Sequence, residues 1–158
     1  MSLTLSEEAQ AKIEEAFSHF PKRQAATLPI LHILQEEFGY VSDEVMRLTA
    51  ELTGTTPVEV QSTVSFYTLF KRKATGKYLL QVCRTLSCSL MGAEGLLDHL
   101  QKKLGIGEGD TTPDGKFTLM AVECLASCGT APVMQINEDY YEKLTPEKLD
   151  QVLASLPD

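Results

Sequence analysis

Two stretches of the sequence share one pattern: residues 78–88 are YLLQVCRTLSC and residues 117–128 are FTLMAVECLASC. In each stretch, a short apolar run typical of a buried strand leads directly to a pair of cysteines. If the two strands are neighbours in one sheet, the cysteine pairs that follow them face each other. The sequence therefore predicts four thiolates around one point at the end of a sheet.

The spacing of the cysteines restricts the chemistry of this site. Four residues separate Cys83 from Cys88, and three separate Cys124 from Cys128. Structural zinc sites place paired cysteines about two to four residues apart, so zinc is a competitor. A [2Fe–2S] cluster needs two cysteines on each of its two irons. Its ligands therefore surround a larger group than a single ion, which suits wider loops. Neither pair is Cys-x-x-Cys, which disfavours a thioredoxin-like dithiol catalyst. A cluster, a zinc ion and redox-active thiols all remain open at this point.

Composition excludes several other classes of protein. The chain has 158 residues, 43% of them hydrophobic, which is enough for one globular domain or two small ones. Its 14 basic and 22 acidic residues give a net charge of −8, which makes nucleic acid an unsuitable partner. No apolar run approaches the roughly 20 residues of a membrane helix, and no secretory signal is visible. We therefore expect a cytoplasmic protein whose clustered cysteines bind metal or do redox chemistry rather than form structural disulfides.

The first half of the chain predicts helices. Ser6 and Ser42 are expected helix caps, and Thr56-Pro57-Val58-Glu59 is a capping box that opens a helix extending to Tyr67. Gly39 is a natural end for the helix of residues 28–38. We expect a bundle of about four short helices over residues 1–75. The basic segment 71–77, where the two halves meet, is expected to be a solvated joint.

The second half alternates between strands and helices. We expect strands at 78–82, 117–123, 131–137 and 140–141, and a helix over residues 92–104. A turn at 113–115 precedes the second strand, and a last helix starts at Thr145-Pro146. This order predicts a small α/β layer structure over residues 76–158, so the fold class of the whole chain is α+β.

At these residues the chain resembles a known family, the small [2Fe–2S] subunit of the NADH-oxidising module of bacterial respiratory complex I (NADH:quinone oxidoreductase). The resemblance extends over nearly the whole chain, and its most specific part is the two cysteine pairs with their spacing. The matching segments are 20–26, 34–40, 64–67, 82–88, 112–117 and 123–134. One departure is Ala126, where glycine is expected after Cys-Leu.

The resemblance implies a fold, a cofactor and a partner. It implies an N-terminal helical bundle followed by a thioredoxin-like [2Fe–2S] ferredoxin domain. It implies that one cluster is bound by Cys83, Cys88, Cys124 and Cys128. It also implies a partner subunit that holds FMN, the NADH site and a [4Fe–4S] cluster, on the cytoplasmic peripheral arm of a membrane complex. The same module occurs in NAD-reducing hydrogenases and NAD-dependent formate dehydrogenases, which stay open as alternative hosts.

No other residues suggest a complete active site. The sequence has no nucleotide-binding glycine motif, so any oxidoreductase activity belongs to the assembly and no catalytic residue is assigned to this chain. His19, His32 and His99 lie away from the cysteines and are expected to be surface or packing residues. Arg84 either stabilises a reduced cluster or points to water, and Glu123 is expected to have a strand-end or interface role. A zinc-stabilised interaction module is the alternative from another class.

Overall fold

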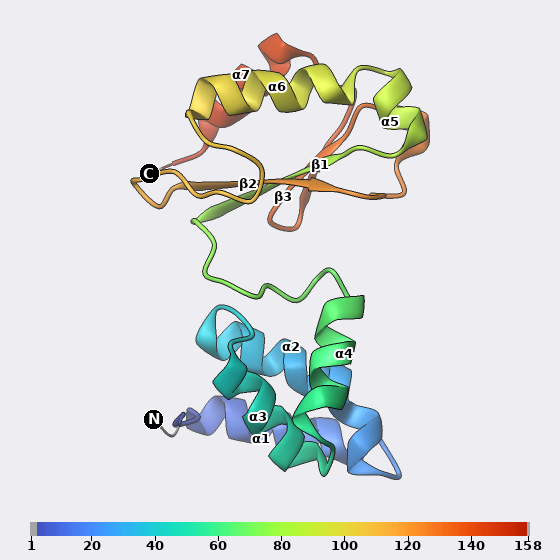
Figure 1. The fold of residues 1–158 in the computed structure, drawn as a ribbon, viewed down its shortest axis with the longest axis vertical. Helices are drawn as coiled ribbons and strands as arrows, with labels where there is room; N and C mark the ends of the chain where they lie inside the picture. Colours follow the sequence, from blue (N-terminus) through green and yellow to red (C-terminus); the bar gives the residue numbers. More distant parts are fainter. Residues whose placement is uncertain (1–2, 158) are drawn as a thin grey trace. The chain divides into compact units, whose positions relative to one another are not determined.

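A computed structural model describes residues 3–157 of the chain. They form two compact units, one ending at Ala74 and the other beginning at Thr75 (Figure 1). Each unit has its own hydrophobic core. Across the described residues, none of the helices has both the length and the apolar character required to cross a bilayer.

The sequence of the first unit supplies a side-chain cap at the start of three of its α-helices. Ser6 and Ser42 accept hydrogen bonds from the backbone N–H groups of Ala9 and Val45, and Thr56 forms a complete capping box with Glu59. The elements are α1 (Glu7–Ser18), η1 (Arg23–Ala26), α2 (Thr27–Phe38), α3 (Asp43–Thr53) and α4 (Pro57–Phe66). The expected helical bundle is therefore confirmed.

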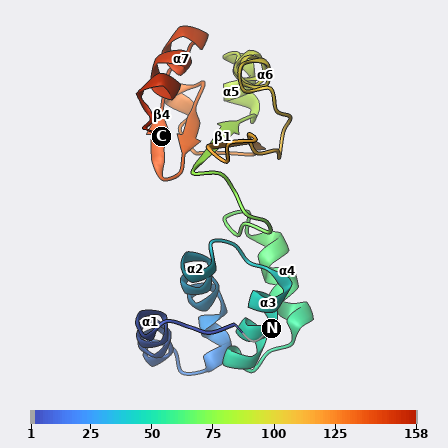
Figure 2. The same cartoon turned by 90° about the vertical axis from the view of Figure 1, so that its left-hand side faces the viewer.

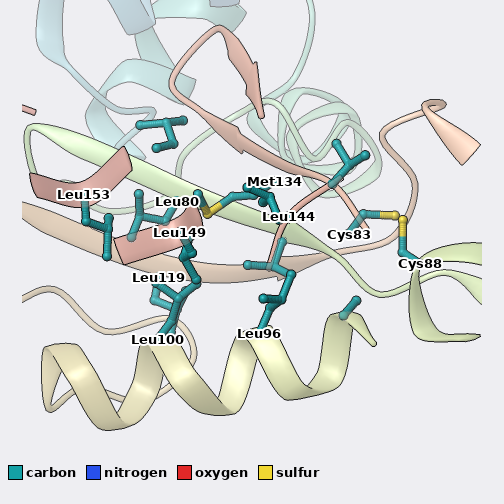
Figure 3. Close-up of a cluster of buried hydrophobic side chains, with 14 of the residues drawn as sticks. Leu80, Cys83, Cys88, Leu96, Leu100, Leu119, Met134, Leu144, Leu149 and Leu153 are labelled. Atoms are coloured by element: carbon teal, nitrogen blue, oxygen red, sulfur yellow. The ribbon is translucent and has the colours of Figure 1, made fainter. Parts of the chain in front are cut away.

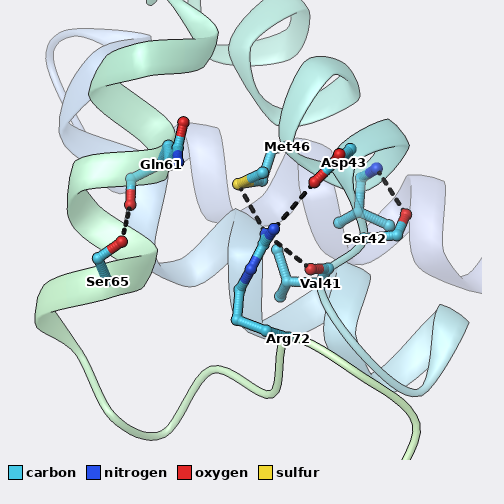
Figure 4. A network of polar contacts seen from close by, with 8 residues as sticks. Val41, Ser42, Asp43, Met46, Gln61, Ser65 and Arg72 are labelled. Carbon is cyan, nitrogen blue, oxygen red and sulfur yellow. Dashed lines mark hydrogen bonds and ion pairs between the residues drawn. The ribbon is translucent and has the colours of Figure 1, made fainter.

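The end of this unit differs from the expectation. Helix α4 stops at Phe66, and Tyr67 has extended backbone angles and is 41% exposed rather than lying on the buried helix face. The basic segment is also not merely solvated. Arg72 donates to the Val41 carbonyl at 3.0 Å and pairs with Asp43 at 2.9 Å, and its guanidinium lies 2.9 Å from the Met46 sulfur (Figure 4). Arg72 thus ties the segment after α4 to the start of α3.

The second unit is a four-stranded sheet with the order β2-β1-β3-β4. Its elements are β1 (Tyr78–Cys83), α5 (Leu86–Leu90), α6 (Ala93–Leu104), β2 (Phe117–Val122), η2 (Cys128–Thr130), β3 (Met134–Ile136), β4 (Asp139–Tyr141) and α7 (Pro146–Ser155). Strands β1 and β2 are parallel, whereas β3 is antiparallel to β1 and to β4. Helices α6 and α7 lie on the same side of the sheet (Figures 1 and 2).

The core of the second unit fills the space between the sheet and these helices (Figure 3). Leu80 and Leu119 on the strands and Leu100 and Leu149 on the helices are fully buried. Cys83 and Cys88 belong to the same buried cluster. This continuity places one end of the core directly against two of the four cysteines.

Two expectations for this unit need correction. Cys88 was expected on a loop but lies in α5, a helix too short to show helical periodicity. The third strand was expected over 131–137, but β3 spans only Met134–Ile136. Pro132 has no N–H to donate to a neighbouring strand, so regular pairing begins after it. The α+β class and the layer arrangement are confirmed.

Candidate functional site

The two cysteine pairs meet at one edge of the sheet. Strands β1 and β2 are parallel neighbours, and Cys83 is in register with Val122, so the segments after both strands leave from the same edge. All four cysteines line a single pocket together with apolar side chains that include Leu86, Leu125 and Val133. The structure thus brings together the four candidate residues. We call residues 83–88 the first cysteine segment and residues 124–128 the second cysteine segment.

The first cysteine segment is part of the folded core. Cys83 and Cys88 are each only 3% exposed, and their sulfur atoms point toward each other (Figure 3). The backbone N–H of Cys83 donates to the Val133 carbonyl at 3.1 Å, and its thiol donates to the Glu123 carbonyl at 3.2 Å. The positions of both sulfur atoms are therefore fixed by the packing of β1 and α5.

The second cysteine segment lies at the surface. Cys124 and Cys128 are both exposed. Between them, Ala126 has a φ of +56°, a left-handed conformation that is costly for a residue with a Cβ. The backbone N–H of Ala126 points at the Cys124 sulfur from 3.4 Å. This segment has no regular structure before η2 starts at Cys128, so it is shaped by individual contacts.

Polar contacts join the two cysteine segments. Glu123 lies just before Cys124, and its carboxylate forms an ion pair with Arg84 of the first segment at 3.0 Å. The hydroxyl of Thr85 donates to the Glu123 carbonyl. Arg84 is more than half exposed, so its pair with Glu123 is screened by water and contributes little to stability. Its structural effect is to hold the starts of the two segments side by side.

The environment separates the pKa values of the two buried thiols. Burial raises the pKa of Cys83, but hydrogen bonds from the backbone N–H groups of Leu125 and Thr85 and from the Cys88 thiol outweigh it, so the pKa is lowered overall. Burial and the hydrogen bond to Cys83 raise the pKa of Cys88. The donors directed at Cys83 favour its thiolate, the form in which cysteine binds iron or zinc, whereas the surroundings of Cys88 favour its thiol.

The donor set fits an iron–sulfur cluster. All the metal-ligating side chains that line the pocket are thiols, and backbone N–H groups and hydroxyls approach the sulfur atoms. Within residues 3–157, no three histidine, cysteine, aspartate or glutamate side chains, the four pocket cysteines included, converge on one point as the ligands of a single metal ion would. The three histidines are not among the pocket residues, and His99 instead contacts Asp150 at 2.8 Å.

Sequence reasoning missed one group beside the pocket. The Glu142 carboxylate accepts hydrogen bonds from the hydroxyls of Ser127 at 2.5 Å and Thr130 at 2.7 Å. Ser127 directly precedes the candidate ligand Cys128. These three residues lie up to 15 positions apart, and no local sequence pattern indicates their contact.

The chain has a helical unit followed by a sheet, and two cysteine pairs lie at the ends of two parallel strands of that sheet. This arrangement defines a ferredoxin-like metal-binding subunit. The sequence matches the family of thioredoxin-like [2Fe–2S] ferredoxins over residues 13–157, and the chain belongs to this family. The resemblance inferred from the cysteine segments is thereby confirmed.

Several curated relatives of the chain are named as subunits of NADH-quinone oxidoreductase. The chain is 48% identical over 153 residues to NADH-quinone oxidoreductase subunit 2 of Thermus thermophilus, and the match covers 95% of this chain and 84% of the relative. It is 44% identical over 153 residues to an NADH-quinone oxidoreductase subunit of Rhizobium meliloti, covering 97% and 89%. It is 37% identical over 148 residues to an NADH-quinone oxidoreductase subunit of Aquifex aeolicus, covering 94% and 92%.

A solved structure has the same fold. An NAD⁺-reducing [NiFe]-hydrogenase in the air-oxidized state superposes with a TM-score of 0.71 at 21% sequence identity, covering 87% of this chain and 25% of that one. At this identity the likeness establishes the fold alone.

Proposed function

We propose that the chain is the electron-transfer subunit of an NADH:quinone oxidoreductase and binds one [2Fe–2S] cluster through Cys83, Cys88, Cys124 and Cys128. The observation behind this proposal is that all four thiols line one pocket at the ends of two parallel strands. The relatives named NADH-quinone oxidoreductase subunits support the choice of host, because they match almost the whole chain at 37–48% identity.

The residues of the pocket would have different roles in such a site. A [2Fe–2S] cluster, when bound, accepts and returns a single electron. Cys83 and Cys88 would hold the cluster from the buried core, and Cys124 and Cys128 would hold it from the surface. Leu86 and Leu125 line the pocket. A flavin that a partner subunit presents to the exposed cysteines would lie close to this site.

The partner in this proposal is the FMN- and NADH-binding flavoprotein subunit of the complex, on its cytoplasmic peripheral arm. Apolar side chains beside the pocket provide a surface for it: Leu86, Leu90 and Met91 on and after α5 are 71%, 78% and 62% exposed. On the helical unit, Phe66 is 78% and Leu69 is 65% exposed. We propose that residues 76–158 are the cluster domain and that residues 1–75 are a helical domain that docks on the complex.

An absorption spectrum of the anaerobically purified chain tests the cofactor, with iron, sulfide and zinc assayed on the same sample. We expect a brown protein with two irons and two sulfides per chain that bleaches with dithionite. A colourless protein with one zinc and no sulfide, even after cluster reconstitution, would contradict the proposal and leave a zinc-stabilised interaction module.

Copurification with the flavoprotein subunit tests the partner. Leu90→Ser removes an exposed apolar side chain next to the pocket and is expected to weaken copurification, while Lys102→Ala, at an exposed position in the last turn of α6, serves as the control in the same unit. The same assay against the flavin subunits of an NAD⁺-reducing hydrogenase tests the second candidate host, whose fold is similar to that of this chain. Stable capture by the hydrogenase subunits alone would transfer the chain to that host.

A further inference from the structure

The second cysteine segment depends on few contacts for its shape. Its cysteines are exposed, and residues 123–127 form neither helix nor strand. Leu125 packs partly against the core, but Ala126 is in a left-handed conformation that its side chain disfavours. Something outside the segment must therefore hold Cys128 in place.

Glu142 is the group in position to do so. Its carboxylate oxygen Oε1 accepts from Ser127 Oγ at 2.5 Å and from Thr130 Oγ1 at 2.7 Å, one residue before and two residues after Cys128. The two hydroxyls also lie 2.6 Å from each other, so the three groups form a closed triangle. Hydrogen bonds to an ionised carboxylate are shorter and about twice as strong as those between neutral groups.

Glu142 is itself anchored to the core of the unit. Lys148 on α7 donates from Nζ to the backbone carbonyl of Glu142 at 2.6 Å. The next residue, Lys143, donates its backbone N–H to the Thr130 carbonyl at 2.8 Å, and Leu144, which is 4% exposed, donates to the Pro132 carbonyl at 3.1 Å. A continuous set of contacts thus runs from α7 through Glu142 to the residues on both sides of Cys128.

We propose that Glu142 is a positioning residue for the cluster, fixing Cys128 through Ser127 and Thr130 and placing a negative charge beside the site. This inference rests on the proposed function, because it assumes a cluster on the four cysteines. Glu142 is not among the residues that line the cysteine pocket. It acts on the ligand through two hydroxyls, as residues outside the first ligand shell of metal sites commonly do.

The test compares Glu142→Gln with Glu138→Gln in the full chain loaded with cluster. Glu138 is an exposed glutamate on the turn between β3 and β4, so its variant matches the loss of charge without the contacts. Glu142→Gln is expected to lose its cluster to a chelator about 10-fold faster, which is the lower range for removing such a partner. Its reduction potential is expected to shift to more positive values, since a negative charge beside the cluster is lost.

A double-mutant cycle separates this role from general stabilisation. If Glu142 acts through the hydroxyls, Glu142→Gln adds no further acceleration of cluster loss in a Ser127→Ala/Thr130→Ala background. Glu142→Asp keeps the charge, so its reduction potential is expected to lie closer to that of the unsubstituted chain than to that of Glu142→Gln. Additive effects in the cycle would overturn the inference. So would a Glu142→Gln chain that unfolds earlier but matches Glu138→Gln in chelator rate and potential.

The cofactor proposal and this inference fail in different ways. If the unsubstituted chain binds no [2Fe–2S] cluster after reconstitution, the proposed function is wrong. If it binds one and Glu142→Gln behaves as Glu138→Gln does, only the role of Glu142 is wrong.

Discussion

The two cysteine segments supply the same number of thiols but are built in different ways. The first segment is an extension of the core: Cys83 ends a buried strand, Cys88 sits in a short helix, and both are 3% exposed. The second segment has two exposed cysteines and is held by polar contacts to its neighbours. Packing of the core therefore positions Cys83 and Cys88, whereas individual hydrogen bonds position the segment that holds Cys124 and Cys128. We expect the second segment to control how easily the cluster is lost.

The largest effect should come from removing the support of the first segment. Leu80 lies in β1 three residues before Cys83 and is fully buried. Leu80→Ala leaves a cavity and is expected to lower the free energy of unfolding by about 2–5 kcal/mol. Urea unfolding of the cluster-free chain measures this change. Leu90→Ala is the control, because Leu90 is 78% exposed and its truncation is expected to change stability by less than about 0.5 kcal/mol.

Replacing one cysteine from each segment by serine compares the segments directly. Both Cys88→Ser and Cys128→Ser remove a thiolate, so iron and sulfide content is expected to fall sharply in each. In the cluster-free chain the two variants should differ. Cys88→Ser buries a hydroxyl and is expected to cost about 1 kcal/mol, whereas Cys128→Ser at the surface should cost less than about 0.5 kcal/mol. Equal losses of stability would show that the segments are not built differently.

Much of this arrangement could be predicted from the sequence, because the signals are local. The caps at Ser6, Ser42 and Thr56 act within one helical turn, and the structure has helices starting directly after each. The apolar runs before the cysteines predicted β1 and β2 as strands of one sheet. Family membership followed from the same segments. The assignment of the four cysteines as cluster ligands stays a prediction.

Other features could not be predicted because they depend on tertiary contacts. Helix α5 has only five residues, fewer than periodicity can indicate, so the helical position of Cys88 was missed. The ion pair between Arg72 and Asp43 joins residues 29 positions apart. The contact of Glu142 with Ser127 requires β3, β4 and the following turn to be in place. The difference in burial between the two cysteine pairs likewise arises only when α5 packs on the sheet.

Ala126→Gly tests the strain in the second segment. Ala126 has a φ of +56°, which glycine adopts without steric cost. Relief of the strain is partly offset by the greater entropy of glycine in the unfolded chain, so we expect a net gain of about 0.5 kcal/mol. Thermal unfolding of the cluster-free chain measures it. Ala121→Gly in β2 is the control and should destabilise, because no positive φ is relieved there. A loss of stability in Ala126→Gly would show that the segment is not strained at this residue.

The smallest effect concerns pH and acts on the second segment through Glu142. Hydrogen bonds from the Ser127 and then the Thr130 hydroxyl lower the pKa of Glu142. A carboxyl whose pKa is lowered in the folded chain contributes stability above its ordinary pKa, and this contribution disappears as the pH falls through the lowered value. The contacts of Cys83 and Thr85 with the Glu123 carbonyl involve a backbone group that does not titrate, and the ion pair between Arg84 and the Glu123 carboxylate is screened by water. Acid should therefore weaken the hold of Glu142 on the second segment.

Thermal unfolding of the cluster-free chain and its Glu142→Gln variant measures this difference. The variant is expected to unfold at a lower temperature at about pH 7, and the gap should close as the pH falls through the lowered pKa of Glu142. Glu138→Gln should show no such convergence. A gap between the chain and Glu142→Gln that stays constant with pH would mean that the carboxylate charge does not hold the second segment, and that only the geometry of the side chain matters there.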